Sequence, residues 1–211
     1  MRNSFHERLL ASGSQDTTIK LWNVITGKCI RNLTGHEGIV FSVSFDQKGL
    51  LASGSGDKTI KLWNVITGKC IITLTGHEYW VSSVSSDKKE LLASGSWDNI
   101  IKLWNVTTGK CIRNFTGHGG AVNSISFDQK GLLASGSWNN IIKLWNVTTG
   151  KCIRTLSGHG KSVWSVSFDK EGLLASGSED STIKLRNVTT GECIRKLIGH
   201  GGSVFSVSFY R

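Results

Sequence analysis

Short apolar runs follow one another along the whole chain, with polar turns between them. VFSVSF at 40–45 is followed by LLASGS at 50–55, TIKLWN at 59–64 and CIITL at 70–74. The runs are rich in β-branched and aromatic residues, and turn sequences such as DQKG and TGK separate them. Because no segment sustains a 3.6-residue apolar period, helices are not expected. The pattern predicts an all-β chain built from units of four strands, which we call a, b, c and d.

The four-strand unit recurs with a period of 41 residues. Gly-His marks each unit at 35–36, 76–77, 117–118, 158–159 and 199–200. Trp-Asn recurs at 22–23, 63–64, 104–105 and 145–146, and Arg186-Asn187 takes its fifth place. A Gly-His near the start and a Trp-polar pair late in a unit of this length resemble the WD-repeat β-propeller, whose repeats each supply four strands. The resemblance runs from Leu9 to Phe209.

The resemblance implies a propeller of five four-stranded antiparallel blades. The fifth unit is split, because strands b, c and d stand at the N-terminus and a last strand a stands at Val204 to Phe209. We therefore expect these two pieces to share one blade and close the ring, so that strand b of that blade is not left as an open edge. A short polar lead at 1–8 would precede a single domain at 9–211. Alternatives are an open arc, which two chains could complete as a homodimer, and a fragment of a larger WD-repeat scaffold.

Each unit also carries His, Ser, Asp and Trp at fixed offsets. A Ser-His-Asp trio suits a hydrolase, but a catalytic trio occurs once per site, and this one is repeated, so no enzyme is predicted. The resemblance implies a structural chain of hydrogen bonds from indole to hydroxyl to imidazole to carboxylate. The predicted members are His36, Ser53, Asp57 and Trp63; His77, Ser94, Asp98 and Trp104; His118, Ser135, Asn139 and Trp145; His159, Ser176 and Asp180; and, on closure, His200, Ser12, Asp16 and Trp22. Arg186 replaces the fourth Trp, and Asp180 is a candidate partner for its charge.

The positions that vary most between units are candidates for partner binding, because the fold does not dictate them. The resemblance places them on the face where the d–a and b–c loops emerge. They are Gln15, Ile39, Phe41, Trp80, Trp97, Asn123, Trp138, Trp164, Glu179 and Phe205. Exposed Trp and Phe are favoured interface anchors. The predicted function is a non-catalytic protein–protein interaction scaffold that binds a peptide or protein there. Alternatives are a small-ligand or glycan-binding propeller and a face whose large side chains only pack on their neighbours.

Composition changes this picture little. The net charge of +10 comes largely from Lys and Arg that recur in strands c and d, so it is attributed to the outer edges of the blades and nucleic acid is an unlikely partner. The chain has no run of 18 apolar residues and no signal sequence at its start, which predicts no membrane span and a cytoplasmic or nuclear location. The five Cys share one position of strand d without CxxC spacing, so we expect buried free thiols and neither metal nor cofactor. Ser pairs in strand a suit a crowded axis. Glu90 replaces a turn Gly, so its unit should be the weakest.

Overall fold

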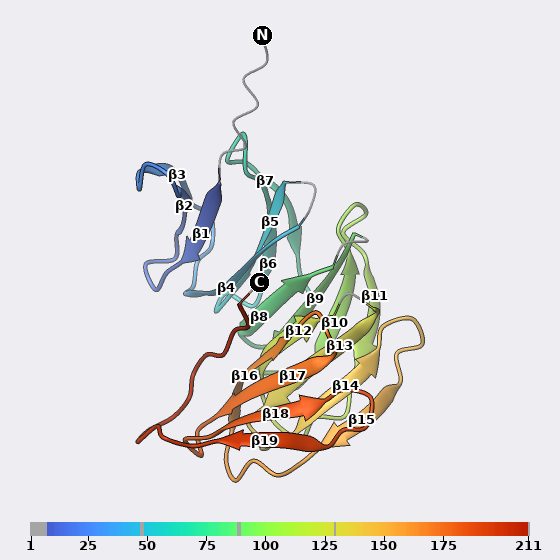
Figure 1. The fold of residues 1–211 in the computed structure, drawn as a ribbon. Helices are drawn as coiled ribbons and strands as arrows, with labels where there is room; N and C mark the ends of the chain where they lie inside the picture. Colours follow the sequence, from blue (N-terminus) through green and yellow to red (C-terminus); the bar gives the residue numbers. More distant parts are fainter. Residues whose placement is uncertain (1–7, 47–48, 88–89, 129, 211) are drawn as a thin grey trace.

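The computed structural model describes residues 8–46, 49–87, 90–128 and 130–210, and all the regular structure in these ranges is β-strand (Figure 1). The strands form one three-stranded and four four-stranded antiparallel sheets, each made of consecutive strands. We call each sheet a blade. This confirms the prediction of an all-β chain of repeated four-strand units.

The strand bounds follow the sequence repeat. In chain order the blades are β1 (Leu9–Gly13), β2 (Ile19–Asn23) and β3 (Cys29–Leu33); β4 (Val40–Phe45), β5 (Leu50–Ser55), β6 (Ile60–Asn64) and β7 (Cys70–Leu74); β8 (Val81–Ser86), β9 (Leu91–Ser96), β10 (Ile101–Asn105) and β11 (Cys111–Phe115); β12 (Val122–Phe127), β13 (Leu132–Ser137), β14 (Ile142–Asn146) and β15 (Cys152–Leu156); and β16 (Val163–Phe168), β17 (Leu173–Ser178), β18 (Ile183–Asn187) and β19 (Cys193–Leu197).

Neighbouring blades pack face to face through the same positions at each interface. Ile60 and Leu62 of β6 lie in one buried cluster with Val81, Leu92 and Trp104 of the next blade. Equivalent clusters form between the other pairs of neighbouring blades. A single sheet cannot bury both of its apolar faces, so stacking supplies the core of a repeat protein. The hydrophobic core is therefore divided into layers between the blades.

Serine side chains of the innermost strands add polar ties between blades. Ser42 Oγ accepts a hydrogen bond from the backbone N–H of Val84 at 3.0 Å, and Ser83 Oγ accepts one from Ile125 at 3.1 Å. Ser124 Oγ does the same for Val166 at 3.1 Å. The Ser pairs expected from crowding at the axis thus also satisfy backbone donors that have no ladder partner on that side.

Arginines of the outermost strands tie each blade to a turn of the next. Arg31 Nε donates to the carbonyl of Val65 at 3.1 Å, and Arg113 Nη2 donates to that of Thr148 at 3.1 Å. Arg154 Nη2 donates to the carbonyl of Thr189 at 2.7 Å. The recurring positive charge of strand d therefore joins neighbouring blades as well as protecting outer sheet edges.

The predicted closure of the ring is not found, and this part of the fold prediction is wrong. Among the described residues the β1–β2–β3 sheet has no fourth strand. The segment 204–209, expected to pair with β1, lies on the β16–β19 blade, where Val204 N–H donates to the carbonyl of Ser178 at 2.9 Å. Figure 1 shows the β1–β3 and β16–β19 blades at opposite ends of an arc. Because every interface repeats the same packing, curvature per blade is fixed, and five steps do not bring the ends together.

The cysteines also differ from expectation, because all five are exposed. They are free thiols at the start of each outermost strand, on the circumference of the arc. Cys29 Sγ, for example, lies 3.3 Å from the carbonyl oxygen of Arg31 in its own strand. The prediction of burial failed because the outermost strand has no neighbour along its free edge.

Replacing Glu90 by Gly is expected to raise the unfolding free energy by about 1 kcal/mol, because Glu90 adopts φ 67°, a left-handed conformation that is costly for a side chain. Gly49, Gly131 and Gly172 occupy the equivalent turn positions, also with positive φ. The exposed hydrogen bond from Thr107 Oγ1 to Glu90 would be lost, which offsets part of the gain. Urea unfolding should be compared with that of Gly131→Glu, which should be less stable than the parent. Equal stability of the three proteins would contradict this explanation.

Candidate functional site

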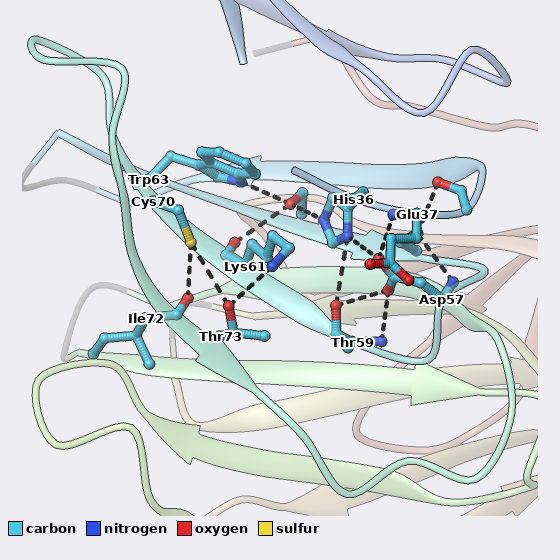
Figure 2. Close-up of polar contacts among 12 residues, drawn as sticks. His36, Glu37, Asp57, Thr59, Lys61, Trp63, Cys70, Ile72 and Thr73 are labelled. Atoms are coloured by element: carbon cyan, nitrogen blue, oxygen red, sulfur yellow. Dashed lines mark hydrogen bonds and ion pairs between the residues drawn. The ribbon is translucent and has the colours of Figure 1, made fainter. Parts of the chain in front are cut away.

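A buried chain of hydrogen bonds crosses the first complete blade (Figure 2). Trp63 Nε1 donates to Ser53 Oγ at 2.8 Å, and Ser53 Oγ lies 2.7 Å from His36 Nε2. His36 Nδ1 lies 2.7 Å from Asp57 Oδ2. Asp57 also accepts hydrogen bonds from the backbone N–H groups of Glu37 and Thr59. The chain therefore joins the d–a loop, the b–c turn and strands b and c within one blade.

The same chain recurs in the next two blades, with one variation. In the second, His77 lies 2.7 Å from both Ser94 Oγ and Asp98 Oδ2, and Trp104 Nε1 donates to Ser94 Oγ at 2.9 Å. In the third, His118 and Trp145 both reach Ser135. There Asn139 replaces the carboxylate, and its uncharged side chain interacts with His118. The third network therefore lacks the carboxylate at its imidazole end.

Burial sets the protonation of these networks. It lowers the pKa of His36 and of His159, although the neighbouring carboxylate opposes the effect. At His118, which has no carboxylate beside it, burial lowers the pKa to about 4. Burial works to raise the pKa of Asp57, but hydrogen bonds from Thr59 and His36 outweigh it and lower the pKa. In the networks of His36 and His159, neutral imidazoles are therefore held beside ionised carboxylates at neutral pH, which suits a structural role.

The fourth network is broken at Arg186, and Asp180 is not its partner. Asp180 Oδ2 instead lies 2.9 Å from His159 Nδ1 and accepts the backbone N–H of Gly160. Arg186 is buried, and its guanidinium donates to the carbonyls of Ser157 and Gly191. Arg186 Nε has no partner among the described residues. The prediction of an Arg186–Asp180 pair failed because backbone carbonyls lie within reach and the carboxylate is already occupied.

The fifth network, which depended on ring closure, lacks its histidine. His200 is exposed at the C-terminal end of the arc. Trp22 Nε1 still donates to Ser12 Oγ at 2.9 Å, and Asp16 Oδ1 accepts the N–H of Thr18 at 3.0 Å. Three of the four predicted members are thus in place around an unfilled position.

Six aromatic side chains form a continuous series across four blades and the C-terminal segment. Successive ring centroids are 5.5 Å apart for Phe41 and Trp80, 4.8 Å for Trp80 and Trp97, 5.1 Å for Trp97 and Trp138, 6.5 Å for Trp138 and Trp164, and 5.6 Å for Trp164 and Phe205. We call this series the aromatic ladder. All six residues are among those predicted for partner binding, and no side chain interrupts their contacts. Such spacings are typical of favourable aromatic pairs.

Backbone hydrogen bonds hold the loops that carry the ladder. Trp97 N–H donates to the carbonyl of Trp80 at 3.0 Å, and Trp138 N–H donates to that of Ala121 at 2.9 Å. Each bond joins a b–c turn to a d–a loop in the same blade. The rings are therefore presented from fixed backbone, which lowers the entropy that binding would cost.

A hollow of about 200 Å³ lies where the ladder meets the innermost strands. Phe41, Ser82, Asn123 and Trp164 line it from one equivalent position in four successive blades, together with Trp97. Two buried polar atoms of this lining, Trp164 Nε1 and Asn123 Oδ1, have no hydrogen-bond partner among the described residues. Both atoms are themselves buried, so the hollow presents aromatic walls with the polar side chains of Ser82 and Asn123 among them.

The other predicted binding residues lie around the ladder without joining it. Ile39 is half-buried, Gln15 is exposed on the β1–β2 turn, and Glu179 forms a 3.7 Å ion pair with Lys161. Sequence reasoning missed Tyr79, an exposed ring with Lys58 Nζ at 5.8 Å from its centroid. The variation of this position between units could have indicated it, since the equivalent residues include Gly38 and Lys161.

Two features are absent from the part of the chain that the structure describes. It contains no group of three His, Cys, Asp or Glu side chains arranged to hold a metal ion. No helix in it is long and apolar enough to cross a membrane.

Comparison with known families agrees with this geometry. The profile of the WD40 family, described as WD domain, G-beta repeat, matches residues 1–23, 27–64, 68–105, 109–146 and 150–187. The chain belongs to the WD40 repeat family, whose members are in general non-catalytic scaffolds for protein interaction.

Several curated proteins resemble one stretch of the chain. Nuclear distribution protein PAC1 of Coprinopsis cinerea is 46% identical over 48 residues, which are 23% of this chain and 11% of that protein. F-box/WD repeat-containing protein 7 of Drosophila melanogaster is 47% identical over 38 residues, 18% of this chain and 3% of that protein. F-box-like/WD repeat-containing protein TBL1X of Mus musculus is 49% identical over 41 residues, 19% of this chain and 8% of that protein. The matched stretches span about a tenth or less of each relative.

Proposed function

We propose that the chain is a protein-interaction scaffold that binds an extended peptide segment of another protein along the aromatic ladder. The observation that carries the proposal is the unbroken series of six rings. Four of them are well exposed, at 41% for Phe41, 39% for Trp80, 47% for Trp138 and 68% for Phe205. Contiguous exposed aromatic side chains on a rigid support are typical of interaction surfaces.

The sequence repeat supports a binding role, because the ladder is not needed to build a blade. Trp22, Trp63, Trp104 and Trp145 recur with the fold and bond to serines. Trp97 and Trp138 stand where other units carry Gln15, Gly56 and Glu179. A blade therefore forms without a ring at that position, and the two tryptophans are available for a partner.

The hollow beside the ladder suits the backbone of a peptide. A peptide unit offers one N–H and one carbonyl, and Ser82 and Asn123 place polar side chains in the lining of the hollow. Apolar side chains of the same segment would stack on the exposed rings. The proposal thus assigns contacts to both the main chain and the side chains of the ligand.

Replacing Trp97 and Trp138 by Ala is expected to weaken a captured protein partner by about 2 kcal/mol, roughly 30-fold, because interface tryptophans contribute most of the binding energy. The wild type serves as bait in a cell extract, and affinities are then measured by titration with the purified partner. Retention of full affinity by the double variant would rule out binding through the ladder.

Two controls separate binding from stability. Ile112→Ala/Ile153→Ala removes similarly exposed apolar side chains, at 49% and 50%, from the outer strands of two blades, and it should leave affinity unchanged. His77→Ala removes a buried member of a network, so it should lower the unfolding free energy by roughly 1–3 kcal/mol without touching the ladder. Capture of a carbohydrate instead of a protein would favour a glycan-binding propeller.

A further inference from the structure

The two ends of the arc expose surfaces that are buried at every internal interface. On the β1–β3 blade, Leu10 is 56% and Val24 is 53% exposed, whereas the equivalent Leu51 and Val65 are 0% and 9% exposed. On the β16–β19 blade, Leu197 is 43% exposed, and its equivalents are buried. Those equivalents are Leu33, Leu74, Phe115 and Leu156. Each end therefore carries one unused half of the interface that holds the blades together.

The C-terminal segment already occupies the place of a strand a beyond the last blade. A Cβ on Gly177 would lie 2.7 Å from Val204 Cγ1 and 3.1 Å from Val207 Cγ1. At the internal interface between β5 and β8, a Cβ on Gly54 would lie 2.8 Å from Val81 Cγ1 and 3.1 Å from Val84 Cγ1. Val207 N–H donates to Ser165 Oγ at 3.1 Å, as Val84 N–H donates to Ser42 Oγ at 3.0 Å. The segment is therefore positioned as the first strand of a further blade, and among the described residues no strand pairs with it as strand b.

The other end of the chain carries strands of the complementary kind. β1, β2 and β3 are strands b, c and d of a blade, and no strand a pairs with β1 in the part of the chain that the structure describes. The segment 204–209 reads VFSVSF, which is identical to β4, and β4 pairs with LLASGS of β5. β1 begins with the same LLASG. The exposed edge of β1 and the unpaired segment are thus complementary in sequence and backbone.

We propose that the chain associates head to tail with a second copy of itself, with residues 204–209 of one copy pairing as the fourth strand against β1 of the next. The register of β4 on β5 places Val207 opposite Ser12 and Phe209 opposite Leu10. Each junction buries Leu10 and Val24 of one copy against Leu197 of the other. Unpaired edge strands are templates for this kind of addition.

Two polar features at the ends match across such a junction. Ser12 and Trp22 are already joined at 2.9 Å, and His200 of the second copy would take the position that His36 holds against Ser53. Arg195 is exposed at the position from which Arg31 reaches the carbonyl of Val65 in the next blade. In the junction Arg195 would reach the turn at Val24. One junction would therefore complete four features together: the apolar interface, the edge-strand pairing, the hydrogen-bond network and the contact of the arginine with the next blade.

The test uses two variants that each block one end. Leu10→Glu places a carboxylate on the β1–β3 face, and Leu197→Glu places one on the β16–β19 face, both at exposed positions. Burying an unpaired carboxylate at the junction is unfavourable, so neither variant should self-associate. The wild type should form concentration-dependent species of at least twice the 23.0 kDa chain mass. An equimolar mixture of the variants should form a 1:1 complex that stops at two chains, since each variant has only one end that can form a junction.

Light scattering and sedimentation over a range of concentrations decide the outcome. Rings and longer series of wild-type chains both support the proposal, because a head-to-tail junction closes or extends according to its rotation. A wild type that stays monomeric throughout, or variants that remain monomeric when mixed, would overturn it, and a ring closed within one chain would give that result. Ile112→Glu, on the outer strand of an internal blade, should associate like the wild type. If a leucine variant loses its β-sheet spectrum, Val24→Glu and Arg195→Glu provide a second pair at the same ends.

Discussion

Replacing Arg186 by Trp is expected to raise the unfolding free energy by about 2 kcal/mol. Arg186 is 6% exposed, and its Nε has no partner among the described residues, so a charge is buried with incomplete hydrogen bonding. Such burial is costly, and an indole would replace it with apolar contact and one hydrogen bond. The variant indole N–H would donate to Ser176 Oγ, as Trp145 Nε1 donates to Ser135 Oγ at 2.8 Å. Urea unfolding measures the gain.

The space for the indole already exists in the fourth network. A Cβ on Gly117 would lie 3.8 Å from the Trp145 ring, and a Cβ on Gly158 would lie 3.3 Å from Arg186 Nη2. The guanidinium therefore occupies the place where the indole ends in the preceding blade. Histidine and serine of this network are also in position, with His159 Nε2 at 2.9 Å from Ser176 Oγ.

The reciprocal change supplies the control. Trp145→Arg removes a buried ring and a donor from an intact blade, and it should lower the unfolding free energy by about 3 kcal/mol or more. If Arg186→Trp is no more stable than the parent while Trp145→Arg is strongly destabilised, the fourth blade has adapted to arginine, and this account of Arg186 is wrong.

The sequence was most informative where every unit repeats the same physical requirement. The strand pattern follows from apolar alternation and turn residues, and the aromatic residues of the ladder stand out because other units lack them at the same positions. Residues such as Trp80 and Trp97 are 17 apart in sequence, and the resemblance to the WD-repeat family, matched unit by unit through the 41-residue period, predicted that they share one face. Repetition within one chain thus replaces much of the information that a single unit cannot provide.

Features that depend on contacts between blades were less accessible. Ser42 and Arg31 act on the following blade, and nothing within their own unit indicates the backbone groups that they bind. Closure of the ring depends on the angle between blades, a small quantity that accumulates over five steps and is not encoded in strand patterns. Exposure of Cys29 depends on the free edge of its strand. The sequence therefore predicts a blade more reliably than it predicts the assembly of blades.

Acidification from pH 6.5 to about 4 is expected to remove about 3 kcal/mol of stability through His118. Burial, together with the charge of Lys143, holds the pKa of His118 at about 4 in the folded chain, below its value of 6.5 when unfolded. Between these values the unfolded chain binds a proton and the folded chain does not, so the unfolding free energy falls as the pH falls. The loss levels off below pH 4 for this group. Burial lowers the pKa of His36 and His159 too, so both add to the loss.

Asn139→Asp isolates the part that belongs to His118. The new carboxylate would stand where Asp98 Oδ2 lies 2.7 Å from His77 Nδ1, and it would raise the pKa of His118 toward its unfolded value. The variant should therefore be more stable than the parent at pH 7, and its stability should fall less steeply between pH 6.5 and 4. Urea unfolding at several pH values across this range measures both slopes. Equal slopes for the two proteins would show that the proton is taken up elsewhere, because the substitution places its carboxylate at His118 Nδ1.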